Sequence, residues 1–462
     1  MTTSISQFAP GFGGELLRDG DAGYDEARHI FNSRLKGRPE LIARATGVAD
    51  VERTMRWAHE TGTPVAIRGG GHMDGYAAPD GAVLLDLSQL RGIEVDGEAR
   101  VARAEAGVLL GELDAATQAH GLATTAGTVT HTGVAGLTLG GGVGFLMRRF
   151  GVTVDNLLSC EVVTTAGKRL TASEEENADL FWALRGGGGN FAVVTRFEYR
   201  LHELGPDVAR GLMVYPLEQA PAVLRNLDEY MRTAPRQAMI IAALTQARGL
   251  PVPPDLAGKP ALILIIGYTG DPDEAEAALA PVLECGEPAL SKVERTAYTT
   301  LNGTLNQLAP WDHRWHLRGG YLEGLGDKVI EGFVASAEAA PTTTDVAPPN
   351  ATIAVWSMGG AMDDFAEDSV AFSRVGARWF YEAVGAWKSN DDDDAHIAWA
   401  DDIDAFMAPH RLSNGYINLG TSADPNWLRN AYGPEKYARL TELKREWDPH
   451  NLLRFNKNIE PE

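Results

Sequence analysis

A glycine-rich segment that ends in a histidine carries the strongest chemical signal in this chain. It spans residues 68–72, reads Arg-Gly-Gly-Gly-His, and lies between two apolar runs at residues 64–67 and 82–87. Glycines let backbone amides approach a ligand closely, and a concave surface lined by amides suits an anion such as a diphosphate. His72 would place a nucleophilic imidazole just beyond that turn. The segment therefore predicts a strand, a ligand-binding turn and a side chain that can act on the bound ligand.

Other glycine clusters indicate further ligand-binding turns, but their sequence context argues against a Rossmann fold. Glycines gather at residues 140–142 and 186–189, and such clusters indicate tight turns around a ligand rather than linkers. Residues 140–144 superficially match the fingerprint of a Rossmann fold. They lack the buried strand before the glycines and the acidic residue about twenty positions after them. The chain also has no G-x-S-x-G elbow, so neither a Rossmann fold nor a serine hydrolase is indicated.

Length, charge and cysteine content exclude several classes of protein. A chain of 462 residues is too long for one ordinary core and predicts two or three domains. The net charge of −22 argues against nucleic acid and an anionic membrane surface as partners. Cys160 and Cys285 provide neither a disulfide framework nor a metal-binding spacing. From the cysteine spacing we expect no bound metal. We recognise no signal peptide and no membrane-spanning apolar run, and we therefore expect a cytoplasmic protein.

The pattern of apolar residues changes along the chain. Up to about residue 204, short strand-like runs alternate with helical segments and glycine turns. Beyond it, longer strand-like runs, such as residues 239–244 and 261–268, are separated by helical segments. This second pattern predicts a large sheet covered by helices. An amphipathic helix over residues 434–447 is expected near the end of the chain.

Several motifs in this order resemble the PCMH-type FAD-binding domain of the vanillyl-alcohol oxidase superfamily. Within that superfamily the chain is most similar to the berberine-bridge-enzyme-like oxidoreductases. The resemblance implies an α+β fold with a two-part FAD-binding domain and a substrate domain built on a large antiparallel sheet covered by helices. The motifs lie at residues 64–88, 127–144, 151–167, 184–194, 416–418, 448–452 and 455–458. The implied domains are an N-terminal arm (1–36), the FAD-binding domain (37–204), the substrate domain (205–410) and a C-terminal segment that returns to the flavin (411–462).

The resemblance also implies how FAD is held. His72 matches the position that bonds covalently to the 8α-methyl carbon of the flavin. Many relatives form a second bond through the cysteine of a G-x-C-x-x-x-G stretch, and here that stretch has Val129 at the cysteine position. We therefore predict one histidyl bond and no cysteinyl bond. The residues predicted to contact the cofactor are Arg68, Gly69, Gly70, Gly71, His72, Gly127, Thr132, Gly136, Gly140, Gly141, Gly142, Asn156, Gly189, Val194, Asn418 and Asn458.

The resemblance assigns the proton transfer to a tyrosine. Relatives carry a Tyr-x-Asn pattern, here Tyr416 and Asn418, whose tyrosine helps to take a proton from the substrate. A phenol with a pKa of about 10 needs a cationic or hydrogen-bonding neighbour to do this near neutral pH. Arg318 and His316 are the candidate neighbours, and Arg318 is predicted to act together with Tyr416.

The expected reaction is the oxidation of a small molecule by FAD and dioxygen. The substrate would be an alcohol or an activated C–H compound, either a secondary-metabolite intermediate or a carbohydrate. Hydride would pass to flavin N5, and dioxygen would reoxidise the flavin to give hydrogen peroxide. Thr132 falls where relatives control oxygen access, and the adjacent His131 either lines the site or is structural. The side chains predicted to line the substrate pocket are Tyr321, Trp356, Met358, Trp379 and Tyr381.

Three alternatives remain open from the sequence. The same covalent flavin would also serve a monooxygenase or a dehydrogenase of a biosynthetic pathway. A flavin-containing binding protein without turnover is a second alternative. The third is a reductase of the UDP-N-acetylenolpyruvylglucosamine branch, which lacks the histidyl bond and holds its flavin dissociably. The sequence does not determine the oligomeric state.

Overall fold

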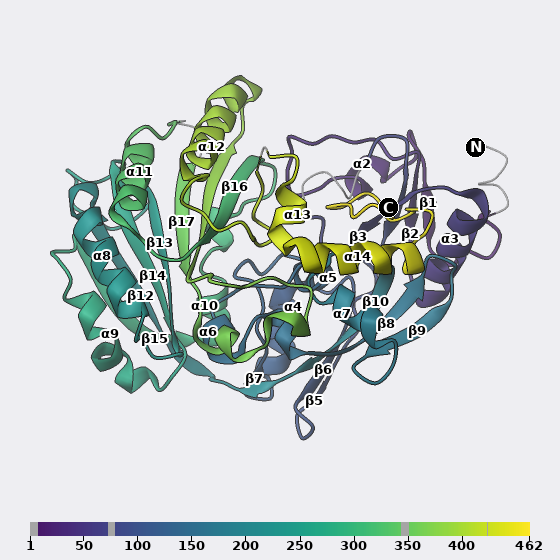
Figure 1. The fold of residues 1–462 in the computed structure, drawn as a ribbon, viewed down its shortest axis with the longest axis horizontal. Coiled ribbons are helices and arrows are strands. Elements are labelled where there is room, and N and C mark those ends of the chain that lie inside the picture. Colours follow the sequence, from purple (N-terminus) through teal and green to yellow (C-terminus); the bar gives the residue numbers. More distant parts are fainter. Residues whose placement is uncertain (1–7, 73–78, 343–350, 423) are drawn as a thin grey trace.

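The computed structural model describes residues 8–72, 79–342, 351–422 and 424–462, which fold around four sheets (Figure 1). None of the helices in these ranges has the length and apolar character needed to cross a bilayer. The α-helices are α2 (Tyr24–Ala27), α3 (Val48–Thr61), α4 (Leu110–Gln118), α5 (Val134–Leu139), α6 (Met147–Phe150), α7 (Ala178–Leu184), α8 (Ala220–Met231), α9 (Ala275–Leu283), α10 (Tyr298–Asn302), α11 (Asp327–Glu338), α12 (Asp393–Met407), α13 (Trp427–Tyr432) and α14 (Pro434–Trp447).

Three of the sheets carry the loops with the glycine motifs. The four-stranded sheet has the order β1-β2-β4-β3, in which β2, β4 and β3 are parallel and β1 is antiparallel to β2. The antiparallel five-stranded sheet has the order β5-β6-β10-β8-β9. A two-stranded ribbon pairs β11 with β7. These strands are β1 (Glu15–Leu17), β2 (Leu41–Arg44), β3 (Val65–Arg68), β4 (Val83–Asp86), β5 (Ile93–Asp96), β6 (Val101–Glu105), β7 (Leu122–Ala123), β8 (Leu157–Thr164), β9 (Arg169–Ser173), β10 (Ala192–Arg200) and β11 (His202–Glu203).

The largest sheet is antiparallel throughout, in the order β15-β12-β14-β13-β17-β18-β16. Figure 1 shows α8, α9 and α11 along its outer side and the glycine-motif part of the chain on its inner side. Together with the smaller sheets and their helices, this sheet confirms the predicted α+β class. The proposed domain boundaries remain a prediction. Its strands are β12 (Asp207–Pro216), β13 (Ala238–Gln246), β14 (Pro260–Tyr268), β15 (Leu290–Ala297), β16 (Arg314–Leu322), β17 (Ala351–Ser357) and β18 (Trp379–Trp387).

Both faces of the seven-stranded sheet are buried, which explains why its central strands are almost entirely apolar. All nine residues of β13 are buried. Successive side chains of a strand point to opposite faces, so Ile240 packs with the outer helices while Ile241 belongs to the cluster on the inner face. The inner face is therefore an apolar wall that looks toward the glycine loops.

Two buried ion pairs lie where distant parts of the chain meet. Arg374, in the segment before β18, forms a bidentate pair with Asp155, with both N–O distances at 2.7 Å and both side chains buried. The second pair joins Lys444 and Asp448 at 2.7 Å, and both side chains are fully buried. Lys444 Nζ also donates to the backbone oxygen of Asn190 at 2.8 Å. This second pair fixes the end of α14 against the loop that precedes β10.

The carboxylate of Asp448 also organises the chain that follows α14. It accepts hydrogen bonds from the backbone N–H groups of Leu452 and Leu453, at 2.8 and 2.9 Å. The carbonyl of Leu452 in turn accepts from the N–H of Val65 at the start of β3. The C-terminal segment is thus attached directly to the strand that leads into the glycine turn.

We expect Asp448→Ala to lower the free energy of unfolding by about 3–5 kcal/mol, because it leaves the Lys444 ammonium buried without its counter-charge. Denaturant unfolding of the purified protein measures this change. The matched control is Glu462→Ala, which removes the exposed Arg429–Glu462 pair of the same segment and should cost less than about 1 kcal/mol. Equal effects of the two substitutions would contradict the importance of the buried pair.

Candidate active site

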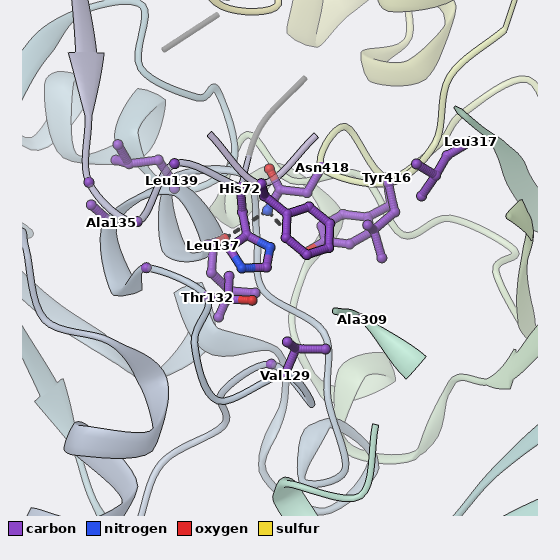
Figure 2. A pocket seen from close by; sticks show the side chains of 18 of the residues that line it. His72, Val129, Thr132, Ala135, Leu137, Leu139, Ala309, Leu317, Tyr416 and Asn418 are labelled. Atoms are coloured by element: carbon purple, nitrogen blue, oxygen red, sulfur yellow. Dashed lines mark hydrogen bonds between the residues drawn. The ribbon is translucent and has the colours of Figure 1, made fainter. Parts of the chain in front are cut away.

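A cavity of about 410 Å³ lies between the glycine loops and the inner face of the seven-stranded sheet (Figure 2). Three parts of the chain line it. The loops around residues 67–72, 127–137 and 188–194 form one side, and strands β13, β14, β16, β17 and β18 form the opposite side. Residues 416–421 and 453–457 of the C-terminal segment complete the wall. The cavity thus brings together all three regions in which the sequence places chemistry.

The turn after β3 reaches the cavity through a very close backbone contact. A Cβ atom on Gly70 would lie 2.3 Å from the backbone nitrogen of Gly133, and one on Gly133 would lie 2.4 Å from that of Gly70. No side chain fits at either position. This contact brings the residue that follows the turn, His72, beside the loop that carries His131.

His72 is held among aromatic rings. Its ring stacks on Phe31 with 4.2 Å between centroids, and its Nε2 lies 2.8 Å from Nδ1 of His131. Trp311 meets the His72 ring edge-on at 5.8 Å. Loss of water around the ring is the main cause that lowers the pKa of His72 to about 3, and the nearby His131 acts in the same direction. His72 is therefore a neutral imidazole near pH 7, with a lone pair for nucleophilic attack.

The position of the second covalent bond in relatives is occupied by an aliphatic side chain. Val129 lines the cavity, as do Thr132 and Gly136 of the same region. Cys160 is buried in the core of the small sheets, and Cys285 packs against the outer helices of the large one. Neither thiol lines the cavity.

Buried polar atoms without partners indicate that the cavity is shaped for a polar ligand. Arg68 Nε, Asn418 Oδ1 and Asn456 Oδ1 have no hydrogen-bond partner among the described residues, and all three residues line the cavity. Buried polar groups are normally hydrogen-bonded. Together with the glycine amides that line the same cavity, these atoms fit FAD, whose ring and diphosphate offer partners to them.

Tyr416 and Asn418 lie side by side in the cavity wall. Asn418 Nδ2 donates to the Tyr416 hydroxyl oxygen at 3.0 Å and to the Leu137 carbonyl at 2.9 Å (Figure 2). Burial raises the pKa of Tyr416 to about 12, although Asn418 and the backbone of Val143 and Gly142 hydrogen-bond to its oxygen and lower it. Tyr416 is therefore a neutral phenol at neutral pH.

The predicted partnership of Arg318 with Tyr416 is wrong. Arg318 and His316 occupy positions of β16 that alternate with the cavity-lining Trp315 and Leu317, so their side chains point to the outer face of the sheet. There Arg318 Nε pairs with Asp401 of α12 at 2.8 Å, and His316 lies 2.9 Å from the same carboxylate. The hydrogen bonds of Tyr416 come from Asn418 and the backbone instead.

The same alternation corrects the predicted substrate pocket. Trp356 lines the cavity, whereas Trp379 and Tyr381 lie on the outer face of the sheet in the cluster formed with α8, α11 and α12. Tyr321 and Met358 belong to the inner cluster, but they are covered and do not line the cavity. Of the five residues predicted for the pocket, the structure therefore places one in the cavity wall.

The residue that the sequence interpretation missed is Glu382, between Tyr381 and Ala383 on β18. It faces the cavity, and its Oε1 accepts a hydrogen bond from Trp356 Nε1 at 3.0 Å. Burial raises the pKa of Glu382 to about 7, although this hydrogen bond lowers it. A signal was present, because Glu382 is the single charged residue in the nine-residue strand.

Most of the predicted cofactor contacts do line the cavity. Five of them do not: four pack against or hydrogen-bond to other parts of the protein, and one lies outside the lining of the cavity. Gly140, Gly141 and Gly142 pack closely on the side chains of Asn418, Phe372 and Thr153, respectively, leaving no room for a Cβ. Asn156 donates to two carbonyls of its own loop, and Asn458 lies beyond the last lining residue. The predicted contacts in the cavity wall are Arg68, Gly69, Gly70, Gly71, His72, Gly127, Thr132, Gly136, Gly189, Val194 and Asn418.

Comparison with known proteins agrees with this geometry. Two family models match the chain: "FAD binding domain" over residues 39–173 and "Berberine and berberine like" over residues 415–460. (R)-6-hydroxynicotine oxidase of Paenarthrobacter nicotinovorans is 28% identical, and the match covers 97% of both chains. Glucooligosaccharide oxidase of Sarocladium strictum is 26% identical over 97% of this chain and 92% of that protein.

A solved structure extends the similarity to the whole fold. The crystal structure of 6-hydroxy-D-nicotine oxidase from Arthrobacter nicotinovorans superposes with a TM-score of 0.85 at 26% identity, covering 98% of each chain. The matched models include the glycine turn with His72 and the Tyr416–Asn418 pair, which the structure brings to one cavity. The chain therefore belongs to the berberine-bridge-enzyme-like FAD-linked oxidoreductases, a family of enzymes.

Proposed function

We propose that the protein is an FAD-dependent oxidase whose flavin is held by one covalent bond, from His72 to the 8α carbon. The observation that carries this proposal is a neutral imidazole in the wall of a cavity lined by glycine amides. Val129, at the position of the second bond in relatives, has no nucleophilic atom. The attachment is therefore histidyl only.

Bound FAD supplies a two-electron acceptor for the substrate, and dioxygen returns it to the oxidised form with release of hydrogen peroxide. The sheet supplies the surface that holds the substrate. Its inner wall is apolar, with Ile241, Ile265, Ala354 and Val384 facing the cavity. This favours a substrate with an apolar body over a carbohydrate, whose many hydroxyls would lack partners on such a wall.

Glu382 and Tyr416 would both contact the polar group of the substrate, each with a different role. With a pKa of about 7, Glu382 is available as a carboxylate near neutral pH and can accept the proton that leaves an alcohol or amine. Tyr416, with a pKa of about 12, retains its proton and can donate a hydrogen bond to the same group. This assigns the proton acceptor to Glu382 and the orientation of the substrate to Tyr416.

The covalent bond is tested by acid precipitation of the purified protein. We expect a yellow pellet whose mass exceeds that of the chain by one FAD. We expect His72→Ala to give a colourless pellet and weak, dissociable flavin. The control is His202→Ala, which removes another partly buried histidine with a lowered pKa that does not line the cavity. Flavin released from the wild-type protein by acid would contradict the attachment and favour the reductase alternative.

The oxidase reaction is tested with a panel of substrates in air. We expect apolar cyclic alcohols and amines to reduce the flavin, and oligosaccharides to do so at least tenfold more slowly. Hydrogen peroxide should form in about one-to-one ratio with oxidised substrate. Incorporation of labelled oxygen into the product would instead establish a monooxygenase. Failure of every compound to reduce the flavin would favour a binding protein.

The role of Glu382 predicts a pH dependence. The carboxylate form is lost as the pH falls through about 7, so kcat/KM should fall about tenfold per pH unit below that value. We expect Glu382→Gln to reduce kcat/KM about 100-fold or more and to abolish this fall at low pH, the acidic limb of the pH profile. Steady-state kinetics between pH 5 and 9 measures both effects.

Two control variants test whether the fall of kcat/KM at low pH comes from Glu382 itself. Asp114 is a buried carboxyl outside the cavity whose pKa is also raised to about 7, and Asp114→Asn should leave the acidic limb in place. Tyr416→Phe should slow flavin reduction far more than reoxidation while retaining the limb. An acidic limb that persists in Glu382→Gln would assign the proton to another group.

A further inference from the structure

Three ring nitrogens meet beside the proposed covalent bond. His131 Nδ1 lies 2.8 Å from Nε2 of His72 and 3.1 Å from Nε1 of Trp311. His72 comes from the turn after β3, His131 from the loop before α5, and Trp311 from the segment that leads into β16. None of the sequence motifs predicts this contact, because its members lie 59 and 180 residues apart.

The chemistry of these groups fixes where their protons lie. An indole nitrogen can only donate a hydrogen bond, so Nδ1 of His131 must present its lone pair to Trp311. The same atom then accepts from His72, whose proton must lie on Nε2. A hydrogen bond to the backbone of Ala309 counteracts the lowering of the pKa of His131 by burial. Because Nδ1 serves as the acceptor, Nε2 is the ring nitrogen left to donate that bond. With its proton on Nε2, His72 keeps its lone pair on Nδ1.

We propose that His131, oriented by Trp311, holds His72 in the tautomer with a nucleophilic Nδ1 and accepts its Nε2 proton as the bond to the flavin forms. This inference rests on the proposed covalent attachment. His131 is a positioning and proton-accepting residue for the attachment of the cofactor, and substrate turnover does not require it.

The step balances in atoms and electrons. A bond forms between His72 Nδ1 and the 8α carbon, and one C–H bond of that methyl group breaks. The methyl group and His72 each give up one proton, and the flavin ring gains two electrons. Dioxygen then takes the two electrons and two protons to give hydrogen peroxide. The proton of His72 Nε2 leaves through His131, which is only partly buried and so in contact with solvent.

Removing the acceptor should slow the attachment without preventing FAD binding. We expect full-length His131→Ala to bind FAD on purification but to hold less than a tenth of it in acid-stable form. The acid-stable fraction should rise slowly with FAD in air, and added imidazole should accelerate it at least tenfold. A structural role of His131 alone would not produce this rescue. Acid precipitation and mass measurement at successive times follow the reaction.

A second substitution tests the two parts of the inference separately. His131→Asn offers an oxygen that accepts both N–H groups but takes no proton, so its attachment rate should lie between those of the wild type and His131→Ala. This variant also keeps the test decisive if His131→Ala does not fold. The matched control is His29→Ala, since His29 contacts Trp311 at 5.7 Å and pairs with Asp312. It should attach FAD at the wild-type rate.

The site of attachment on the ring is the independent measurement. NMR of the flavin peptide from the wild-type protein should show the bond at His72 Nδ1, and a bond at Nε2 would overturn the inference. Full and immediate attachment in His131→Ala would also overturn it, as would a lack of rescue by imidazole. If the wild type itself carries no acid-stable flavin, the proposed tether fails, which is a different result from attachment that is independent of His131.

Discussion

The active site depends on one steric constraint, the mutual contact of two glycine backbones. Gly70 and Gly133 approach so closely that neither position admits a Cβ atom. The contact joins the turn after β3 to the loop that carries Val129, His131 and Thr132. Without it, His72 and His131 would not lie within hydrogen-bonding distance, and the turn would not present its amides to the cavity.

The large sheet is the second half of the site, and it works because both of its faces are buried. The outer face packs against helices, while the inner face forms one wall of the cavity. An apolar wall removes water from every ionisable group that faces it. Burial is accordingly the largest cause of the shifted pKa values of His72, Tyr416 and Glu382. One physical effect leaves His72 as a neutral imidazole and Tyr416 as a neutral phenol, and it brings the pKa of Glu382 close to neutral pH.

The sequence predicts the part of the site that is made by backbone turns, since consecutive glycines such as Gly70 and Gly71 indicate a tight turn or a close backbone contact. It predicts much less of the part that is made by the sheet. In a strand buried on both faces, such as β18, the alternation of polar and apolar residues disappears, so nothing in the sequence tells which face Trp379 occupies. In β16 the alternation of Arg314, His316 and Arg318 with Trp315 and Leu317 does indicate two different faces, but the sequence does not tell which of them looks toward the cavity. The contact of Trp311 with His131 depends on the packing of segments far apart in the chain. Glu382 is the exception, because a single charged residue in an otherwise apolar strand indicates a functional position that the sequence alone could have identified.

The net charge of the chain gives a physical reason for the proposed covalent bond. A protein with a net charge of −22 offers no favourable long-range field to a diphosphate. Among the described residues that line the cavity, only Arg68 and Lys457 carry a cationic side chain. Backbone amides supply hydrogen bonds but no net charge. A bond through His72 would remove the need for strong ionic binding, because a cofactor attached once cannot dissociate. In the proposed mechanism the hydrogen bonds of His131 and Trp311 act during assembly of the enzyme, whereas Glu382 and Tyr416 act in each turnover.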